Sequence, residues 1–134
     1  MKLTFIINKP ANIIFDYLTD MQKFVSVHPV ITKINPIENS SYLVYETLKF
    51  GFIPISFTYP VTVESKWADK TIHIRATVMR LTKIEMKFTI KEDKGFSIIE
   101  ETIHFQSPLP VQSIMEGIFK KQHSLLFMNI ELLQ

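Results

Sequence analysis

The 134-residue sequence contains no cysteine, which excludes a disulfide framework and thiolate chemistry. It has only three glycines and is 46% apolar, a composition that argues against disorder. No apolar run approaches the roughly 18 residues that a membrane-spanning helix needs. The net charge is only +2 and no dense run of Lys and Arg occurs, so a nucleic-acid partner is not expected.

Motifs for metal and cofactor chemistry are also missing. The four histidines form no i, i+4 pair and no cluster with zinc-ligand spacing. The sequence has no phosphate-binding loop, dinucleotide fingerprint or G-x-S-x-G motif. We therefore expect no metal and no cofactor. The apolar part of the opening segment is too short for a signal peptide, so we expect a cytoplasmic protein without integral membrane contact. Its length predicts a single domain, 1–134.

The order of periodic patterns predicts an α+β domain. A short strand at 3–7 precedes two short helices, the second of which can begin after Asp20 and should end before Pro29. Residues 30–105 alternate between apolar and polar side chains, which predicts six strands. Pro54 and Pro60 lie within one of these strands and predict a bulge or a sheet edge. Apolar residues at 3.6-residue spacing from 111 to 133 predict one long helix of about 34 Å.

A long helix and a sheet with one apolar face each can bury both faces against one another. We therefore expect an α+β architecture with the order β-α-α-β6-α. In it, a curved seven-stranded antiparallel sheet wraps around the long C-terminal helix. A strongly curved sheet leaves a space between itself and the helix.

The segments PANIIFDYLTDMQKFVSVHPVI and LPVQSIMEGIFKKQHSLLF, with this order of elements, resemble the START-like (SRPBCC) superfamily, which includes the Bet v 1-like and polyketide cyclase groups. The resemblance covers essentially all residues. It implies the helix-grip fold, α+β, with a hydrophobic cavity for a lipid-, sterol- or polyketide-like molecule, and in some branches cyclase or dehydratase activity. The glycine-rich loop of plant Bet v 1-type members is absent, and the matching loop here reads IENSSY.

Two adjacent glutamates lie in the last predicted strand, where neighbouring side chains point to opposite faces. Ile99 and Ile103 mark the apolar face of this strand, and Glu101 lies two residues from each of them, on the same face. We therefore expect the Glu101 side chain to be buried and that of Glu100 to point to solvent. A buried carboxylate without a partner is costly, so a donor, a water molecule or a ligand group should meet it. Glu101 is therefore either a structural residue or a polar group that projects into the cavity.

A second carboxylate, Glu46, faces inward if Val44 and Leu48 do. The opposite parity would place Leu43 and Tyr45 inside instead, and the sequence leaves both arrangements open. If Glu46 faces inward, it lies beside the aromatic residues of the following strand. It would then be the second acidic group available to a ligand.

Three further polar residues are candidates for the site. Gln122 lies at the centre of the helix stripe and either points into the cavity or bonds to a strand residue. Tyr59 is suited to hydrogen-bonding a ligand, or is a core residue with a satisfied hydroxyl. His28 follows the second helix and is either a proton shuttle with a pKa near neutrality or a surface residue. His123, on the flank of the stripe, is similarly open.

On the outer face, a three-residue loop at 79–81 would set Arg75 opposite Glu85. Another register would oppose Arg75 to Lys87, which like-charge repulsion disfavours. We therefore predict a cross-strand ion pair between Arg75 and Glu85, without a role in the site.

We predict a binding protein for a small, largely hydrophobic molecule, acting as a monomer or weak homodimer. The expected apolar walls are Phe57, Met86, Phe88, Met115 and Phe119. The expected polar contacts are Glu101, Glu46, Gln122 and Tyr59. The alternative is a cyclase- or dehydratase-like enzyme in which Glu101 or Glu46 exchanges protons with a carbonyl compound, helped by Tyr59 or His28. A third possibility is a partner-binding domain whose own side chains fill the cavity.

Overall fold

The computed structural model describes the backbone of residues 1–134 and every side chain except that of Phe50. In chain order the elements are β1 (Lys2–Ile7), α1 (Ala11–Thr19), α2 (Met21–Val27), β2 (Ile31–Glu38), β3 (Ser41–Phe50), β4 (Ile53–Lys66), β5 (Thr71–Val78), β6 (Thr82–Asp93), β7 (Phe96–Gln106) and α3 (Gln112–Glu131). The predicted order β-α-α-β6-α is confirmed. Within the described chain, none of the helices combines the length and hydropathy that a bilayer crossing requires.

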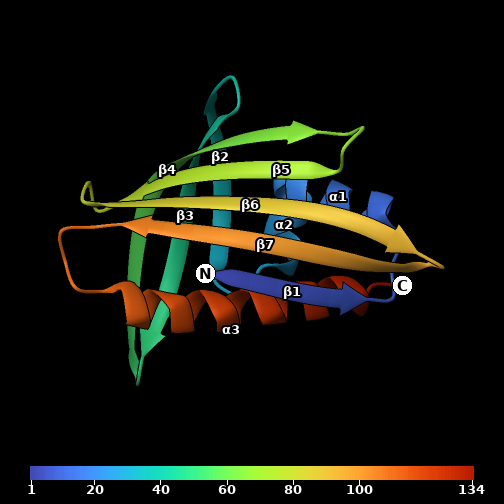
Figure 1. Ribbon diagram of the computed structural model, residues 1–134. Coiled ribbons are helices and arrows are strands. Elements are labelled where there is room, and N and C mark those ends of the chain that lie inside the picture. The colour runs from blue at the N-terminus through green and yellow to red at the C-terminus, as the bar shows by residue number, and fades with distance from the viewer.

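The strands form a single antiparallel sheet in the order β1-β7-β6-β5-β4-β3-β2. Figure 1 shows the sheet bent so strongly that β2, β3 and the first part of β4 run across the direction of β5–β7. The α3 helix lies along the concave side, and α1 and α2 connect the two edge strands, β1 and β2. The curved sheet and the long helix thus bury their apolar faces against each other, as the sequence pattern predicts.

The two prolines of β4 lie where no ladder hydrogen bond needs their missing N–H. The N–H of Val63 donates to Ser40 at 2.9 Å, so alternate residues of β4 direct their N–H groups toward β3. Pro54 and Pro60 are even-numbered whereas Val63 is odd-numbered, so their nitrogens point away from β3, toward the side on which β5 pairs with β4. Pairing with β5 begins only at Val61, so this side is an edge along 53–60. The predicted edge is therefore confirmed for the first half of β4, where the sheet bends.

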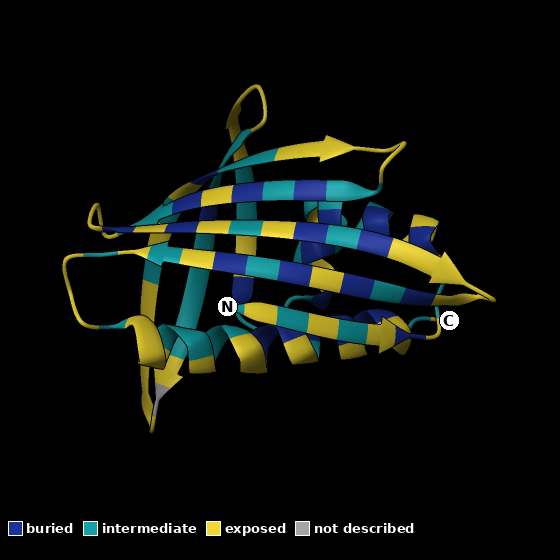
Figure 2. Cartoon of the chain, in the orientation of Figure 1, coloured by how far each residue is buried: buried dark blue, intermediate teal, exposed yellow. Residues whose placement is uncertain are grey.

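The C-terminal half of α3 packs on a solid core. The rings of Phe127 and Phe5 of β1 have centroids 4.6 Å apart, and Phe127 lies 6.2 Å from Phe88 of β6. Leu126 and Ile130 are fully buried beside them. Figure 2 shows this buried stripe on α3 and the alternation of buried and exposed residues along β6 and β7. Each such side chain contributes about 1.5–3 kcal/mol by leaving water, so this half anchors the helix.

The α2 helix begins at Met21 with the predicted cap. The side chain of Asp20 accepts hydrogen bonds from the N–H groups of Gln22 and Lys23, at 3.1 and 3.2 Å. The helix ends at Val27, and the carbonyl of Val27 accepts a hydrogen bond from the Asn129 side chain of α3 at 2.8 Å. Both ends of α2 are therefore fixed, which holds the following residue, His28, in place.

On the outer face the predicted register is confirmed, because Arg75 lies opposite Glu85. The predicted ion pair between them is wrong. Arg75 Nη1 instead lies 3.2 Å from Glu64 Oε1 of β4, and Glu85 Oε1 lies 2.7 Å from His73 Nε2. A residue in a central strand has diagonal neighbours on two sides, and the pattern of one hairpin does not determine which neighbour it contacts.

Candidate functional site

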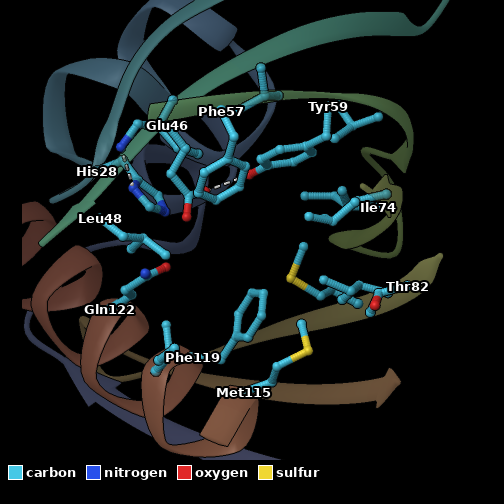
Figure 3. A pocket seen from close by; sticks show the side chains of 18 of the residues that line it. His28, Glu46, Leu48, Phe57, Tyr59, Ile74, Thr82, Met115, Phe119 and Gln122 are labelled. Atoms are coloured by element: carbon cyan, nitrogen blue, oxygen red, sulfur yellow. Dashed lines mark hydrogen bonds between the residues drawn. The ribbon is translucent and has the colours of Figure 1, made fainter. Parts of the chain in front are cut away.

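A cavity of about 490 Å³ lies between the N-terminal half of α3 and the bent sheet. This volume is in the range of roughly 300–1,000 Å³ typical of small-molecule sites. Most of its lining side chains are apolar, and they come from α2, β2–β6, the β7–α3 loop and α3. Four predicted wall residues line it: Phe57, Met86, Met115 and Phe119. Figure 3 shows Met115 and Phe119 facing Phe57 and Ile74 across the open space.

The fifth predicted wall residue, Phe88, belongs to the core, and the prediction that it lines the cavity is wrong. Its ring lies behind His123, with centroids 6.0 Å apart, and is 1% exposed. Phe88 shares the inward face of β6 with Met86 but lies two residues further along the strand. At that point α3 packs directly on the sheet, whereas at Met86 the two are separated by the cavity.

Polar groups gather in one region of this apolar cavity. The hydroxyl of Tyr59 donates a hydrogen bond to Glu46 Oε1 at 2.7 Å, and both side chains line the cavity. Gln122 lines it from α3, and Figure 3 shows its amide on the same side as Glu46 and His28. The open parity of β3 is thus resolved, because Val44, Glu46 and Leu48 all face inward. Of the two arrangements that the sequence leaves open, the structure has the one with Glu46 inside.

Burial shifts the proton affinities of this Glu46–Tyr59 pair. Desolvation raises the pKa of the Glu46 carboxyl, and the hydrogen bond from Tyr59 offsets the rise only in part, with smaller contributions from His123 and Gln122. Desolvation also raises the pKa of the Tyr59 hydroxyl well above its ordinary value, and the neighbouring Glu46 adds to this rise. Tyr59 therefore stays a neutral donor, while Glu46 takes up a proton more readily than an exposed carboxylate.

His28 lines the cavity next to this pair, in a fixed orientation. Its Nδ1 accepts hydrogen bonds from the N–H groups of Val30 and Ile31, at 3.2 and 3.1 Å, so the neutral ring carries its proton on Nε2. Desolvation, helped by the nearby His123, lowers the pKa of His28 to about 3. The expectation of a pKa near neutrality is therefore wrong, and His28 serves the cavity as a neutral donor.

Glu101 is 1% exposed, which confirms its predicted burial, but it is not among the side chains that line the cavity. His123 of α3 covers it. The Nδ1 atom of His123 lies 2.7 Å from both carboxylate oxygens and has hydrogen-bond geometry toward Oε1. The prediction that Glu101 projects into the cavity is wrong, because a donor from the helix reaches the carboxylate first.

His123, whose role the sequence leaves open, lies between the cavity and Glu101. It is 3% exposed, lines the cavity on one side and bonds Glu101 on the other. The spacing of the sequence indicates this position. His123 lies four residues from both Phe119 and Phe127, so all three side chains lie on the same face of the helix. Because Nδ1 faces Glu101, the other ring nitrogen, Nε2, points away from the carboxylate.

The ionisable side chains of the cavity are one carboxyl, one phenol and two imidazoles. The lining includes Glu46, Tyr59, His28 and His123, and none of the described lining side chains is a lysine or arginine. Among the described residues, no group of three or more His, Asp or Glu side chains is arranged to hold a metal ion. The site is thus equipped for hydrogen bonding and proton exchange in apolar surroundings.

Three solved structures illustrate the likeness of this chain to known folds. Ara h 8.0201 is 16% identical, with 98% of this chain and 93% of that chain covered and a TM-score of 0.76. A START superfamily protein from Mycobacterium smegmatis is 15% identical, with 98% and 93% covered and a TM-score of 0.77. The ZhuI aromatase/cyclase from Streptomyces sp. R1128 is 12% identical, with 97% and 89% covered and a TM-score of 0.74. No family model and no curated protein matches the sequence.

The lowered pKa of His28 predicts a loss of stability in acid. The unfolded chain binds a proton at His28 near pH 6.5, whereas the folded chain does so only near pH 3. Between these values, falling pH favours unfolding by at most about 1.4 kcal/mol per pH unit from this residue. His28→Asn keeps an acceptor for the two N–H groups and removes the titration. Urea unfolding from pH 7 to 4.5 should therefore show a steeper loss for the wild type than for the variant, and parallel profiles would contradict the assignment.

Proposed function

We propose that this chain, which has the helix-grip fold of the START-like superfamily, binds a small, largely apolar and uncharged molecule in the cavity under α3. The proposal rests on one observation: a cavity of about 490 Å³ has apolar walls and a few polar groups gathered in one region. Such a cavity favours an apolar body by the area it removes from water, and orients it through a few hydrogen bonds.

The polar groups specify the chemistry of the ligand's polar end. Acceptors are available at Glu46 Oε2 and the Tyr59 oxygen, and donors at His28 Nε2 and the Gln122 amide. A hydroxyl or carbonyl group can satisfy such a mixed set. A carboxylate or phosphate would lie beside Glu46 with no lysine or arginine among the described lining residues to compensate it. The preferred ligand is therefore neutral, such as an alcohol, phenol or ketone.

A second function, proton transfer of the cyclase or dehydratase type, is favoured by the Glu46–Tyr59 contact. A carboxyl with a raised pKa and a neutral hydroxyl 2.7 Å apart face the same apolar space. Once the Tyr59 hydroxyl breaks its bond to Glu46 and turns to donate to a carbonyl oxygen of the substrate, Glu46 as a carboxylate could remove a proton from the neighbouring carbon. One of the structures of similar fold is named an aromatase/cyclase. Binding needs only the cavity, whereas this reaction also needs Glu46 to ionise.

Binding can be tested with a matched pair of probes, 1-naphthol and 1-naphthoate, at pH 7 by isothermal titration calorimetry. We expect 1-naphthol to bind at least about tenfold more tightly, because the naphthoate charge would be buried without a partner. Ala76→Phe should weaken binding strongly, since Ala76 lines the cavity and a phenyl group there takes up part of the space for the ligand. Ala68→Phe, at an exposed position, is the control. Equal or tighter binding of naphthoate would refute a neutral-ligand site.

Catalysis can be tested on an aromatic β-hydroxy ketone, 4-hydroxy-4-phenylbutan-2-one, which loses water to form a conjugated enone that absorbs in the ultraviolet. If the second function holds, the wild type accelerates this elimination and Glu46→Gln abolishes the acceleration while 1-naphthol still binds. Glu38→Gln, on the exposed end of β2, should keep the wild-type rate. A rate equal to that of buffer alone would leave binding as the function.

A further inference from the structure

Large apolar side chains project into solvent around one end of the molecule. They belong to the β3–β4 turn, the β5–β6 turn, the β7–α3 loop and the first turn of α3, which Figure 1 shows at the end where α3 begins. We call this set the apolar rim: Phe52, Ile53, Met79, Leu81, Leu109 and Ile114. Phe52, at the tip of its turn, is fully exposed. A cluster of this kind is typical of a surface that contacts a partner or a membrane.

The apolar rim is continuous with the cavity. Met79, Leu109 and Ile114 are exposed to solvent and also line the cavity, so they form its mouth. The polar groups lie deeper, since Gln122 is two turns further along α3 than Ile114 and is 7% exposed. A molecule entering through this mouth therefore meets apolar side chains first and the hydrogen-bonding groups last.

The charges within the segments that carry the rim have a single sign. The segments 49–56, 78–83 and 107–115, which carry the rim, contain Lys49, Arg80 and Lys83 and no aspartate or glutamate. All three cations are exposed. The next charged residue along α3 is Glu116, which is half-buried. Exposed apolar side chains flanked by cations suit the interface of a bilayer whose head groups are anionic.

The β5–β6 turn holds its part of the rim in a strained conformation. Met79 and Arg80 both have positive φ, 55° and 61°, and the N–H of Leu81 donates to the carbonyl of Val78 at 3.2 Å. This is a type I′ turn, whose central positions favour asparagine and glycine because other side chains are strained there. An exposed methionine and an arginine nevertheless occupy both positions. Retained strain of this kind is common at functional sites.

We propose that the apolar rim docks this domain on a lipid bilayer that carries anionic head groups. The rim side chains enter the interface between head groups and acyl chains, while Lys49, Arg80 and Lys83 contact the phosphates. The mouth of the cavity then faces the bilayer, and an apolar ligand passes between them without crossing bulk water. This transfer of ligand rests on the proposed function, whereas the docking itself does not.

Vesicle flotation tests the docking with matched variants at the two ends of the molecule. The probes are vesicles of phosphatidylcholine alone and of phosphatidylcholine with 30 mol% phosphatidylserine. We expect the wild type to float several-fold more with the anionic vesicles. Phe52→Ser and Arg80→Glu should each reduce this binding at least fivefold. Phe96→Ser and Lys94→Glu are the controls and should leave binding unchanged. At the opposite end of the molecule, Lys94 is a positive-φ cation in the β6–β7 turn and Phe96 is an exposed phenylalanine at the start of β7.

Several outcomes would overturn docking. The first is that the wild type floats with neither kind of vesicle. The second is that the control variants lose as much vesicle binding as the rim variants. The third is a dimer in sedimentation that Phe52→Ser dissociates, which would show that the rim joins two copies of the chain. The 1-naphthol titration separates this proposal from the proposed function. If the Phe52→Ser variant no longer binds vesicles but still binds 1-naphthol, the result supports docking by the rim with an intact cavity. A wild type that binds vesicles but no probe supports docking and refutes the ligand site.

Discussion

The buried contact between Glu101 and His123 determines how α3 lies on the sheet. A carboxylate removed from water needs a partner, and α3, which packs over Glu101 on the concave side, supplies it through His123. Bonding to His123, together with the Asn129–Val27 hydrogen bond and the Phe127–Phe5 contact, sets the rotation and the axial position of α3. With His123 over Glu101, Phe127 falls into the core and Gln122 falls at the cavity.

The same contact marks the boundary between two interiors. Toward the C-terminus of α3, aromatic and branched side chains fill the space between helix and sheet completely, with Phe88 packed between His123 and Phe127. Toward the N-terminus of α3 the sheet bends away and leaves the cavity. Phe119 of the cavity wall packs against Phe105 of β7, with ring centroids 5.5 Å apart. Core packing supplies stability in one half, so that the other half can remain hollow.

The polarity of the hollow half changes along α3 in a way that connects the two proposals. From Ile114 at the mouth to Gln122 in the interior is a rise of about 12 Å, the length of a small apolar body. The polar groups at the inner end favour a ligand that enters with its hydroxyl or carbonyl first. Its apolar part then remains beside the exposed rim. A bilayer is the environment in which such an orientation needs no exposure of apolar surface to water.

Sequence patterns were sufficient to predict the element order, the inward parity of Glu101 and the central position of Gln122 on its helix, because these follow from periods of two and 3.6 residues. They were insufficient to separate cavity from core among inward residues. Met86 and Phe88 share one face, and only the line along which α3 touches the sheet distinguishes them. The parity of Glu46 was open because both faces of its strand carry apolar residues. The partner of Glu101 depended on side-chain reach across 22 residues of sequence, and no local pattern encodes such reach.

The most direct measurement of the contact on which this arrangement depends is the protonation of the His123 imidazole by ¹⁵N nuclear magnetic resonance. We expect a proton on Nδ1 that exchanges slowly with water and whose resonance moves in Glu101→Gln but not in Glu100→Gln, the neighbour on the outer face. A bare Nδ1, or a proton that exchanges as fast as that of a solvent-exposed histidine, would show that the helix is not held on the sheet in this way.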